Sequence, residues 1–232
     1  MAIKWLAIWL TSLTHQNRKA AMYKLISATP SPYARKVRIQ LAEKGIPFEL
    51  ITEVPWNSDT QTPLHNPLEK LPVLICDDGS SVFESRYINE WIEYKHPTPP
   101  LFPKDIDGIL AVKRYEVIAD GACDALVQMF FEVARDPDKQ SKPWFDRQER
   151  KVDGALRSFS DSVGSKKFCH GDTLTLADIA VGTLLRYLTV RWPAKPWREQ
   201  YPGLAVYSDR LETRPSFVAT VPVPQVIRDR VA

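Results

Sequence analysis

Apolar and polar positions follow two different patterns along the chain, and the pattern changes after residue 96. In the first part, "YKLISA", "IPFELITEV" and "PVLICDDGSSVF" are short apolar runs bounded by proline, glycine or polar residues. Runs of this kind predict β-strands. Asp78-Gly79 lies inside the third run and predicts a hairpin turn between two strands. The first part is therefore expected to contain two strands followed by a hairpin.

Two helices are expected between and after these strands. Tyr33, Val37 and Leu41 recur at i, i+4 and i+8, which places them on one face of a helix. Gly45 follows as a left-handed cap. Another helix is expected from Glu84, directly after the hairpin. The predicted order is βαβ-ββα, which is the thioredoxin-like pattern.

The second part of the chain has helical periodicity throughout. A proline-rich segment, "KHPTPPLFPKD", cannot continue a helix and is expected to link the two parts. No proline interrupts Asp105 to Ala134. In "TLTLADIAVGTLLRYL", Thr175 and Asp178 have the spacing of a capping box, whose cap is worth about 0.5 to 2 kcal/mol. The predicted fold class is α+β, with an all-α helical-bundle domain after the thioredoxin-like domain.

These patterns divide the chain into four segments. Residues 22–96 are expected to form the thioredoxin-like domain, 97–104 the linker and 105–232 the helical domain. Residues 1–21 precede the regular pattern and are expected to be a poorly ordered extension. Their short apolar run and their lack of acidic residues resemble a targeting peptide, although the cleavage-site pattern is weak.

Composition and charge bear on whether the protein binds a membrane or a nucleic acid. Hydrophobic residues make up 44% of the chain and charged residues 25%, which is typical of globular proteins. No apolar run approaches the roughly 20 residues of a membrane span. The net charge is +3, and the basic residues form no run. Neither a membrane nor a nucleic acid is therefore expected as a partner.

The three cysteines indicate the compartment. Cys76, Cys123 and Cys169 are widely spaced and odd in number. This arrangement suits neither a disulfide framework nor a zinc site. We therefore expect a reducing compartment, the cytoplasm, and no metal cofactor.

Five short sequences together carry a resemblance to a known family. They are "PSPYARKVRI", "EKLPVL", "FESRYINEW", "GDTLTLADIAV" and "RPSF". Each one alone is weak, because serine-proline helix starts and capping boxes occur in many folds. In this order and spacing, the chain resembles the cytosolic glutathione S-transferase superfamily over about 200 residues, from Tyr23 to Pro222. "PSP" followed by an aromatic residue most resembles the serine-type classes, such as the plant tau class and related bacterial and fungal enzymes.

The resemblance implies an enzyme that uses glutathione as a co-substrate and activates its thiolate for attack on a small hydrophobic electrophile. The electrophile would lie between the two domains, against the helix from Asp105 to Ala134. A homodimer is also implied. A glutathione-dependent lyase, isomerase or dehalogenase remains an alternative, as does a non-catalytic ligand-binding or regulatory module. No cysteine lies in residues 27–36, which excludes the mixed-disulfide chemistry of omega-like members.

Ser31 is the candidate catalytic residue. Serine is a favoured helix N-cap, and Pro32 suits the first helical turn. Lowering a thiol pKa of about 8.5 by two units requires about 2.7 kcal/mol of preference for the anion. A hydrogen bond to a charged group supplies about 1.5 to 3 kcal/mol, and a helix N-terminus adds about 0.3 to 1. Ser27 and Thr29 remain alternative partners of the sulfur, and pure capping is the other interpretation of Ser31.

The resemblance assigns glutathione binding to Lys70, Leu71, Pro72, Glu84 and Ser85. A cis bond is expected between Leu71 and Pro72, which would let a peptide-like ligand pair with the Leu71 backbone. At the predicted strand-to-helix junction, Ser85 could donate to the γ-glutamyl carboxylate and Glu84 could accept from its ammonium. Lys70 would meet the glycyl carboxylate. The alternatives are a trans proline that starts a strand, a serine cap and a solvated surface lysine.

Overall fold

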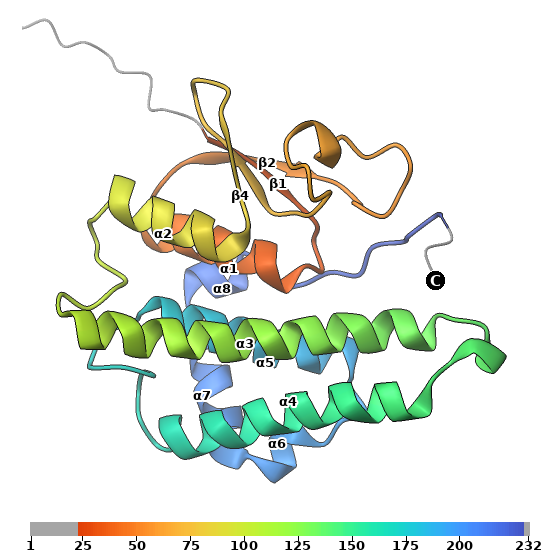
Figure 1. The fold of residues 1–232 in the computed structure, drawn as a ribbon. Coiled ribbons are helices and arrows are strands. Elements are labelled where there is room, and N and C mark those ends of the chain that lie inside the picture. Colours follow the sequence, from red (N-terminus) through yellow and green to blue (C-terminus); the bar gives the residue numbers. More distant parts are fainter. Residues whose placement is uncertain (1–22, 230–232) are drawn as a thin grey trace, which may run out of the picture.

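The computed structural model describes residues 23–229 and places a small sheet layer above a stack of helices (Figure 1). The predicted extension, residues 1–21, lies outside the described residues. The thioredoxin-like order and the α+β fold class are confirmed. No helix within the described range is long and apolar enough to cross a membrane.

The sheet has four strands in the order β2-β1-β3-β4. Their bounds are Tyr23–Ser27 for β1, Phe48–Thr52 for β2, Val73–Ile75 for β3 and Ser81–Phe83 for β4. β1 and β2 are parallel, whereas β3 pairs antiparallel with β1 and β4. Since parallel neighbours need a crossover connection, helix α1, Pro32–Glu43, joins β1 to β2.

Helices α1 and α2 cover one face of the sheet. Helix α2 spans Ser85–Lys95 and follows β4 directly. Gly45 and Gly79 have φ angles of +63° and +81°, as the predicted helix cap and hairpin turn require. The core beneath the sheet consists of buried apolar side chains from the strands and both helices: Tyr23, Leu25, Val37, Leu41, Leu74, Val82, Ile88 and Ile92.

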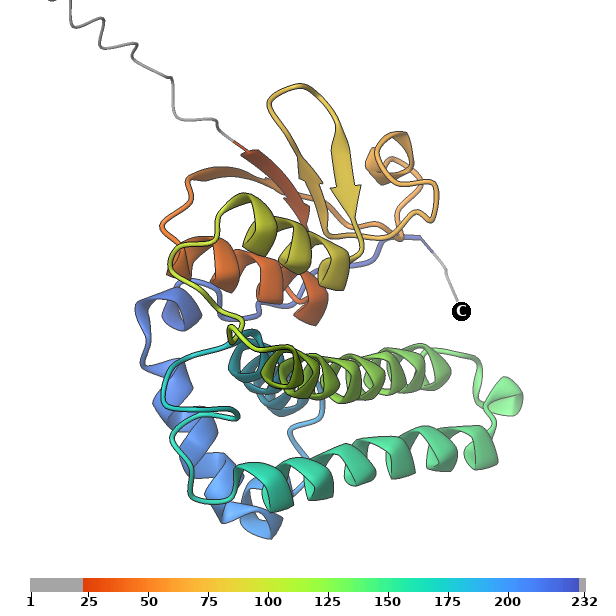
Figure 2. The same cartoon turned by 60° about the vertical axis from the view of Figure 1, so that its left-hand side comes forward.

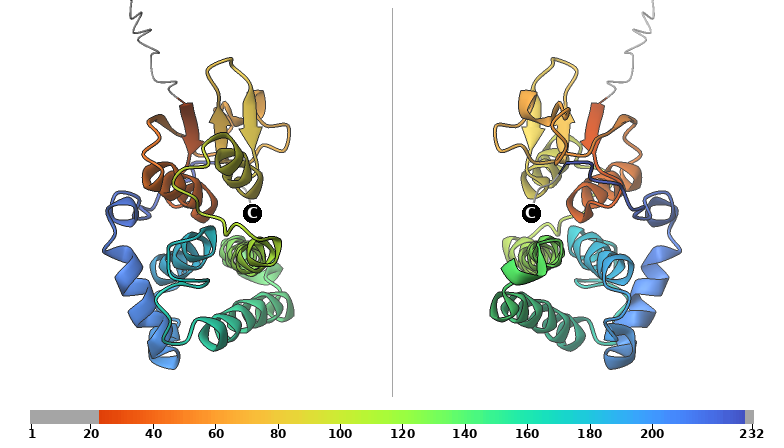
Figure 3. Two further views of the ribbon diagram at one scale, coloured as in Figure 1. Left: turned by 90° about the vertical axis from the view of Figure 1, so that its left-hand side faces the viewer. Right: turned by 90° about the vertical axis from the view of Figure 1, so that its right-hand side faces the viewer.

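The second part of the chain is helical, as predicted. Its helices are α3, Ile106–Val133; α4, Lys142–Val163; α5, Leu176–Arg191; α6, Trp197–Gln200; α7, Pro202–Glu212; and α8, Pro215–Val218. Short 3-10 helices span Thr62–Leu64 and Pro137–Lys139. Figure 3 shows α3 and α5 directly below α1 and α2, with α4 and α7 farther from the sheet.

Helix α5 is buried on every side near its start because α1, α3 and α7 surround it. The predicted capping box is present between Thr175 and Asp178. Asp178 is fully buried and also accepts hydrogen bonds from the backbone of Cys169 at 2.7 Å and the hydroxyl of Tyr207 at 2.7 Å. Asp178 therefore joins three segments, whereas the predicted box joins only one helix to its own start.

Charged residues of α1 connect the sheet layer to the helical part. The Arg35 guanidinium donates two hydrogen bonds to Glu212 of α7, at 3.0 and 2.8 Å. Arg214 contacts Glu43 in the same two-pronged way, at 2.9 and 2.7 Å. Paired guanidinium-carboxylate contacts fix orientation as well as distance. These contacts therefore fix the position of α1 relative to the helical part.

Candidate active site

A cavity of about 520 Å³ opens where the sheet layer meets α3 and α5. The segments that line it are the β1-α1 turn, the loop between β2 and β3, the start of α2, the middle of α3, the end of α5 and the C-terminal tail. All six predicted site residues are on its wall: Ser31, Lys70, Leu71, Pro72, Glu84 and Ser85. Folding thus brings together residues that lie up to 54 positions apart in the sequence (31 to 85).

Ser31 is the N-cap of α1. Its Oγ accepts a hydrogen bond from the backbone N–H of Ala34 at 3.2 Å. Within residues 23–229, no acceptor takes the hydrogen of this hydroxyl. Because the oxygen caps the helix while the hydrogen stays available, the same group can stabilise the helix and donate to an anion in the cavity.

The two alternative hydroxyls do not line the cavity. Ser27 is 1% exposed, and its Oγ lies 3.4 Å from the Ala28 carbonyl oxygen. Thr29 donates its hydroxyl to the carbonyl of Val223 in the C-terminal tail, at 2.8 Å. Of these three candidate residues, Ser31 alone lines the cavity.

The Leu71-Pro72 bond is cis, as expected. Leu71 is half-buried and Pro72 is buried at the cavity wall. Just before them, the Asn66 side-chain amide donates to the carbonyl of Lys70 at 2.6 Å. The Lys70 ammonium is exposed and has no carboxylate partner among the described residues. The backbone here is thus held by Asn66, while the Lys70 charge remains available to a ligand.

Glu84 and Ser85 form the junction between β4 and α2. Glu84 has a φ of 72°, an uncommon angle for a residue with a side chain. Such strained positions concentrate at functional sites. The Glu84 carboxylate accepts from the backbone N–H of Arg86 at 3.4 Å, and the Ser85 hydroxyl lies 3.5 Å from it. Both residues line the cavity beside the start of α2.

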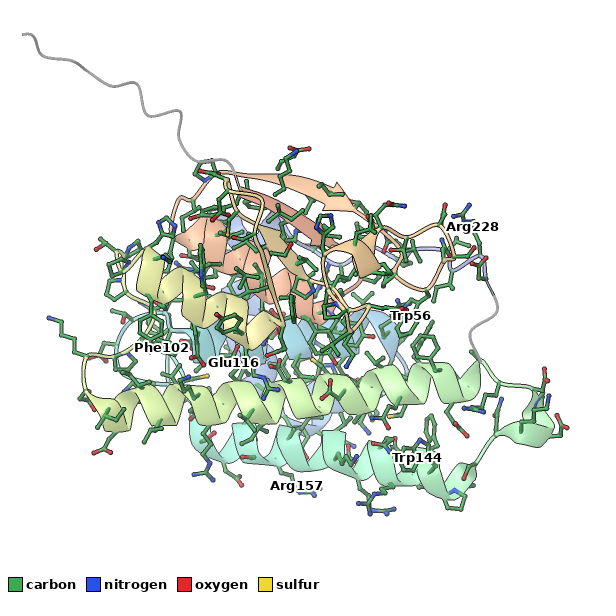
Figure 4. All side chains as sticks on the ribbon, turned by 45° about the horizontal axis from the view of Figure 1, so that its top comes forward. Trp56, Phe102, Glu116, Trp144, Arg157 and Arg228 are labelled. Atoms are coloured by element: carbon green, nitrogen blue, oxygen red, sulfur yellow. The ribbon has the colours of Figure 1, made fainter. Side chains whose placement is uncertain are left out.

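Sequence reasoning missed a cluster of charges behind this junction. Lys36 of α1 is 2% exposed and places its ammonium 2.7 Å from Asp120 and 2.9 Å from Glu116. Arg86 lies 3.6 Å from Asp120 and 3.5 Å from Glu84. Figure 4 shows Glu116 on α3 facing α2. Lys36 is 80 positions from Glu116 and 84 from Asp120 in the sequence, so no local sequence pattern predicts the cluster.

Burial raises the pKa of the Asp120 carboxyl to about 6, against the opposing effect of Lys36. An unfolded aspartate has a pKa of about 3.9. The folded chain therefore holds this proton more tightly than the unfolded chain does. Asp120 contributes stability that is complete below about pH 4 and is lost as the pH rises through about 6.

We therefore expect the Asp120→Asn variant to lack this part of the pH dependence. The difference in unfolding free energy between variant and wild type should change between about pH 4 and 6 and be flat above that range. Urea denaturation at several pH values measures it. The control is Asp124→Asn, an exposed carboxylate on the same helix and cavity wall. Parallel pH curves for Asp120→Asn and wild type would contradict the assignment.

Aromatic side chains form the part of the cavity nearest the helical layer. The Trp56 ring meets the Phe131 ring edge to face, with centroids 4.6 Å apart, and Figure 4 shows Trp56 above the second half of α3. Tyr33 donates its hydroxyl to Asp124 of α3. On the α3 and α5 side, the lining residues are Asp120, Asp124, Val127, Gln128, Phe130, Phe131, Tyr187 and Arg191. The resemblance implied that the electrophile lies against α3, and residues of α3 do line the cavity.

The C-terminal tail completes the rim of the cavity. Gln225 and Ile227 line it. The backbone N–H of Arg228 donates to Asn57 at 2.9 Å, and its guanidinium lies 2.6 Å from Asp59. Figures 1 and 2 show the tail running between the sheet layer and α3. The position of this tail depends on contacts with residues about 170 positions earlier, which the sequence pattern did not indicate.

Comparison with known proteins gives consistent matches. The family described as glutathione S-transferase, N-terminal domain, matches residues 30–95, and its C-terminal domain counterpart matches residues 142–210. The chain is 37% identical over 201 residues to the GST-like protein YibF of Escherichia coli, covering 86% of this chain and 98% of YibF.

Solved structures agree with these sequence matches. A glutathione S-transferase from Methylobacterium radiotolerans, in complex with glutathione sulfonate, is 59% identical with a TM-score of 0.89, covering 91% of this chain and all of that one. Another from Methylobacillus flagellatus, with glutathione bound, is 39% identical with a TM-score of 0.84, covering 87% of this chain and all of that one.

Proposed function

We propose that this chain, which belongs to the glutathione S-transferase family, binds glutathione in the cavity and activates its thiolate for attack on a small electrophile. One observation carries the proposal. Ser31 lines the cavity at the N-terminus of α1, together with residues suited to hold a peptide. Relatives of the same fold hold glutathione or glutathione sulfonate.

In the proposed complex, glutathione pairs with the backbone of Leu71 as a short additional strand. Its γ-glutamyl end lies at the start of α2, where Ser85 donates to the carboxylate and Glu84 accepts from the ammonium. Lys70 meets the glycyl carboxylate. The thiol then lies near the start of α1.

Ser31 acts on the sulfur in this arrangement. Its hydroxyl donates to the thiolate, and the positive end of α1 favours the negative charge. The thiolate forms a sulfur–carbon bond with the electrophile. A leaving group then departs with the displaced electron pair, or an activated double bond gains the sulfur and a proton. Cavity residues from α3 and α5 surround the electrophile.

A glutathione titration followed by a turnover screen tests this proposal. We expect binding of glutathione at millimolar concentration or below, and conjugation of a general electrophile such as 1-chloro-2,4-dinitrobenzene. Absence of glutathione binding would reject the site. Binding without turnover in assays of conjugation, dehalogenation and isomerisation would favour a non-catalytic ligand carrier. Turnover only in the isomerisation or dehalogenation assay would identify the alternative reaction.

We also propose that the protein is a homodimer. Tyr87 of α2 and Val117 of α3 are exposed apolar residues on neighbouring helices and line one shallow groove. Sedimentation equilibrium should give twice the mass of one chain, and Val117→Asp should shift the equilibrium to monomer. Val206→Asp, at a 65% exposed position on α7, is the control and should stay dimeric. A monomeric wild type would contradict the proposal.

The cytoplasm is the compartment that we propose. Cys76, Cys123 and Cys169 are all free thiols. Burial raises the pKa of Cys123 and of Cys169, which keeps these two thiols protonated. Free thiols are typical of a reducing compartment.

A further inference from the structure

Arg191 is a cation that lines the cavity and has no carboxylate partner in the part of the chain that the structure describes. It lies in the last turn of α5. The other guanidinium on the cavity wall, that of Arg86, faces Asp120 and Glu84. No carboxylate lies within ion-pair distance of Arg191 among residues 23–229. Its Nε atom is buried and has no hydrogen-bond partner there.

Aromatic groups hold the Arg191 guanidinium in place. Its central carbon lies 4.7 Å from the centre of the Phe130 ring, a cation-π contact. Tyr187 lies one helical turn earlier on the same face of α5. Burial raises the pKa of Tyr187 to about 12, against the opposing effect of Arg191, so its hydroxyl is neutral at physiological pH. The neutral Tyr187 hydroxyl and the Arg191 cation therefore lie on the same part of the cavity lining.

Among the cations that line the cavity, Arg191 is the one placed beside the aromatic side chains and able to bind an anion there. Lys70 and Arg86 stand with Glu69, Glu84, Ser85 and Asp120 on the side proposed for glutathione. Asp124 is engaged by the Tyr33 hydroxyl. The rings of Trp56, Phe130 and Phe131 offer flat apolar contact on the other side. Arg191 is half-buried, and its buried Nε atom has no hydrogen-bond partner among residues 23–229, so a ligand carboxylate would supply the missing acceptor.

We propose that Arg191 selects electrophiles that carry a carboxylate on a planar, apolar body. The planar body lies against the rings of Trp56, Phe130 and Phe131, and the carboxylate accepts hydrogen bonds from Arg191 and Tyr187. This inference rests on the proposed function, because it takes the sulfur of bound glutathione to lie on the Ser31 side of the same cavity. Arg191 is thus a specificity-determining residue and has no part in activating the thiol.

Two glutathione thioethers test the inference without requiring turnover. S-(4-carboxybenzyl)glutathione carries the carboxylate, and S-(4-carbamoylbenzyl)glutathione is its neutral isostere. Isothermal titration calorimetry on the wild-type protein should show about tenfold tighter binding of the acid, the size expected for a hydrogen-bonded charge in a partly open site. Arg191→Met should remove this preference, and Arg191→Lys should retain part of it.

The matched control is Arg157→Met. Arg157 is exposed on α4, and Figure 4 shows it on the side of that helix away from the sheet layer. The Arg157→Met variant loses the same positive charge as Arg191→Met and should keep the tenfold preference for the acid. Both variants should bind free glutathione as the wild type does, which shows that Arg191→Met has folded.

The outcomes separate the inference from the proposed function. Equal affinity of the two thioethers for wild type, or an acid preference that survives in Arg191→Met, would overturn the role of Arg191 while glutathione binding stands. A preference lost equally in Arg157→Met would also overturn it, because the effect would then be one of net charge. Failure of glutathione and both thioethers to bind would reject the proposed function itself.

Discussion

The Ser31→Ala variant is expected to lose about 10- to 150-fold in kcat/KM for glutathione conjugation. This range corresponds to the loss of one hydrogen bond to a charged group, worth about 1.5 to 3 kcal/mol. Ser31 lines the cavity, and its hydroxyl donates to no acceptor among the described residues. The pKa of the bound glutathione thiol should rise by about one to two units, which ultraviolet absorbance of the thiolate measures directly.

Three further variants separate catalysis from helix capping. Glycine at an N-cap costs only a few tenths of a kcal/mol, whereas alanine costs about 1. Ser31→Gly should therefore lose activity with little loss of stability, and Ser31→Thr should keep part of both. Thr29→Val removes a nearby hydroxyl that is bound to the Val223 carbonyl and should leave the thiol pKa unchanged. Unchanged turnover in both Ser31→Ala and Ser31→Gly would rule out the catalytic role.

The Asp178→Ala variant is expected to lose about 3 to 4 kcal/mol of unfolding free energy. Its carboxylate is fully buried and accepts four hydrogen bonds, at 2.7 to 2.9 Å, from the backbone and hydroxyl of Thr175, the backbone of Cys169 and the hydroxyl of Tyr207. Removing the acceptor leaves several buried donors without partners, and each one costs about 1 to 3 kcal/mol before relaxation. Urea denaturation measures the loss.

Thr175→Ala is the matched control for this prediction. It removes the side chain at the cap of the same helix, while Asp178 keeps its bonds to Cys169 and Tyr207. A loss of about 0.5 to 2 kcal/mol is expected for a cap of this kind. Equal losses in the two variants would show that Asp178 acts only within the capping box. A larger loss in Asp178→Ala supports its role in joining the three segments.

Asp178 also shows which contacts the sequence could predict and which it could not. The spacing of Thr175 and Asp178 predicts a capping box because the two groups lie within one helical turn, and the box is present. The contacts with Cys169 and Tyr207 depend on how α7 and the preceding loop pack against α5. The sequence-based estimate for the box therefore covers only part of the stability expected from this carboxylate.

The six predicted site residues show the same division. Ser31, Glu84 and Ser85 were identifiable because each stands at a helix start, and the motifs carried a family resemblance. The resemblance also identified the segment of Leu71 and Pro72. That these residues line one cavity depended on the sheet order, which places the ends of β1 and β4 at one edge of the sheet with the start of β3 between them.

By itself, the sequence determined the order of strands and helices, the turns and the helix caps. These features depend on groups a few residues apart, whose relative positions follow from the backbone conformation. Only the tertiary structure decided that Lys36 is buried against Asp120, that Arg191 lies over Phe130, and that the tail reaches Thr29. Each of these pairs is separated by between 61 and 194 positions in the chain (191 − 130 = 61). They become neighbours only when the helices and the sheet have packed together, so the charges and the aromatic wall of the cavity belong to the folded chain.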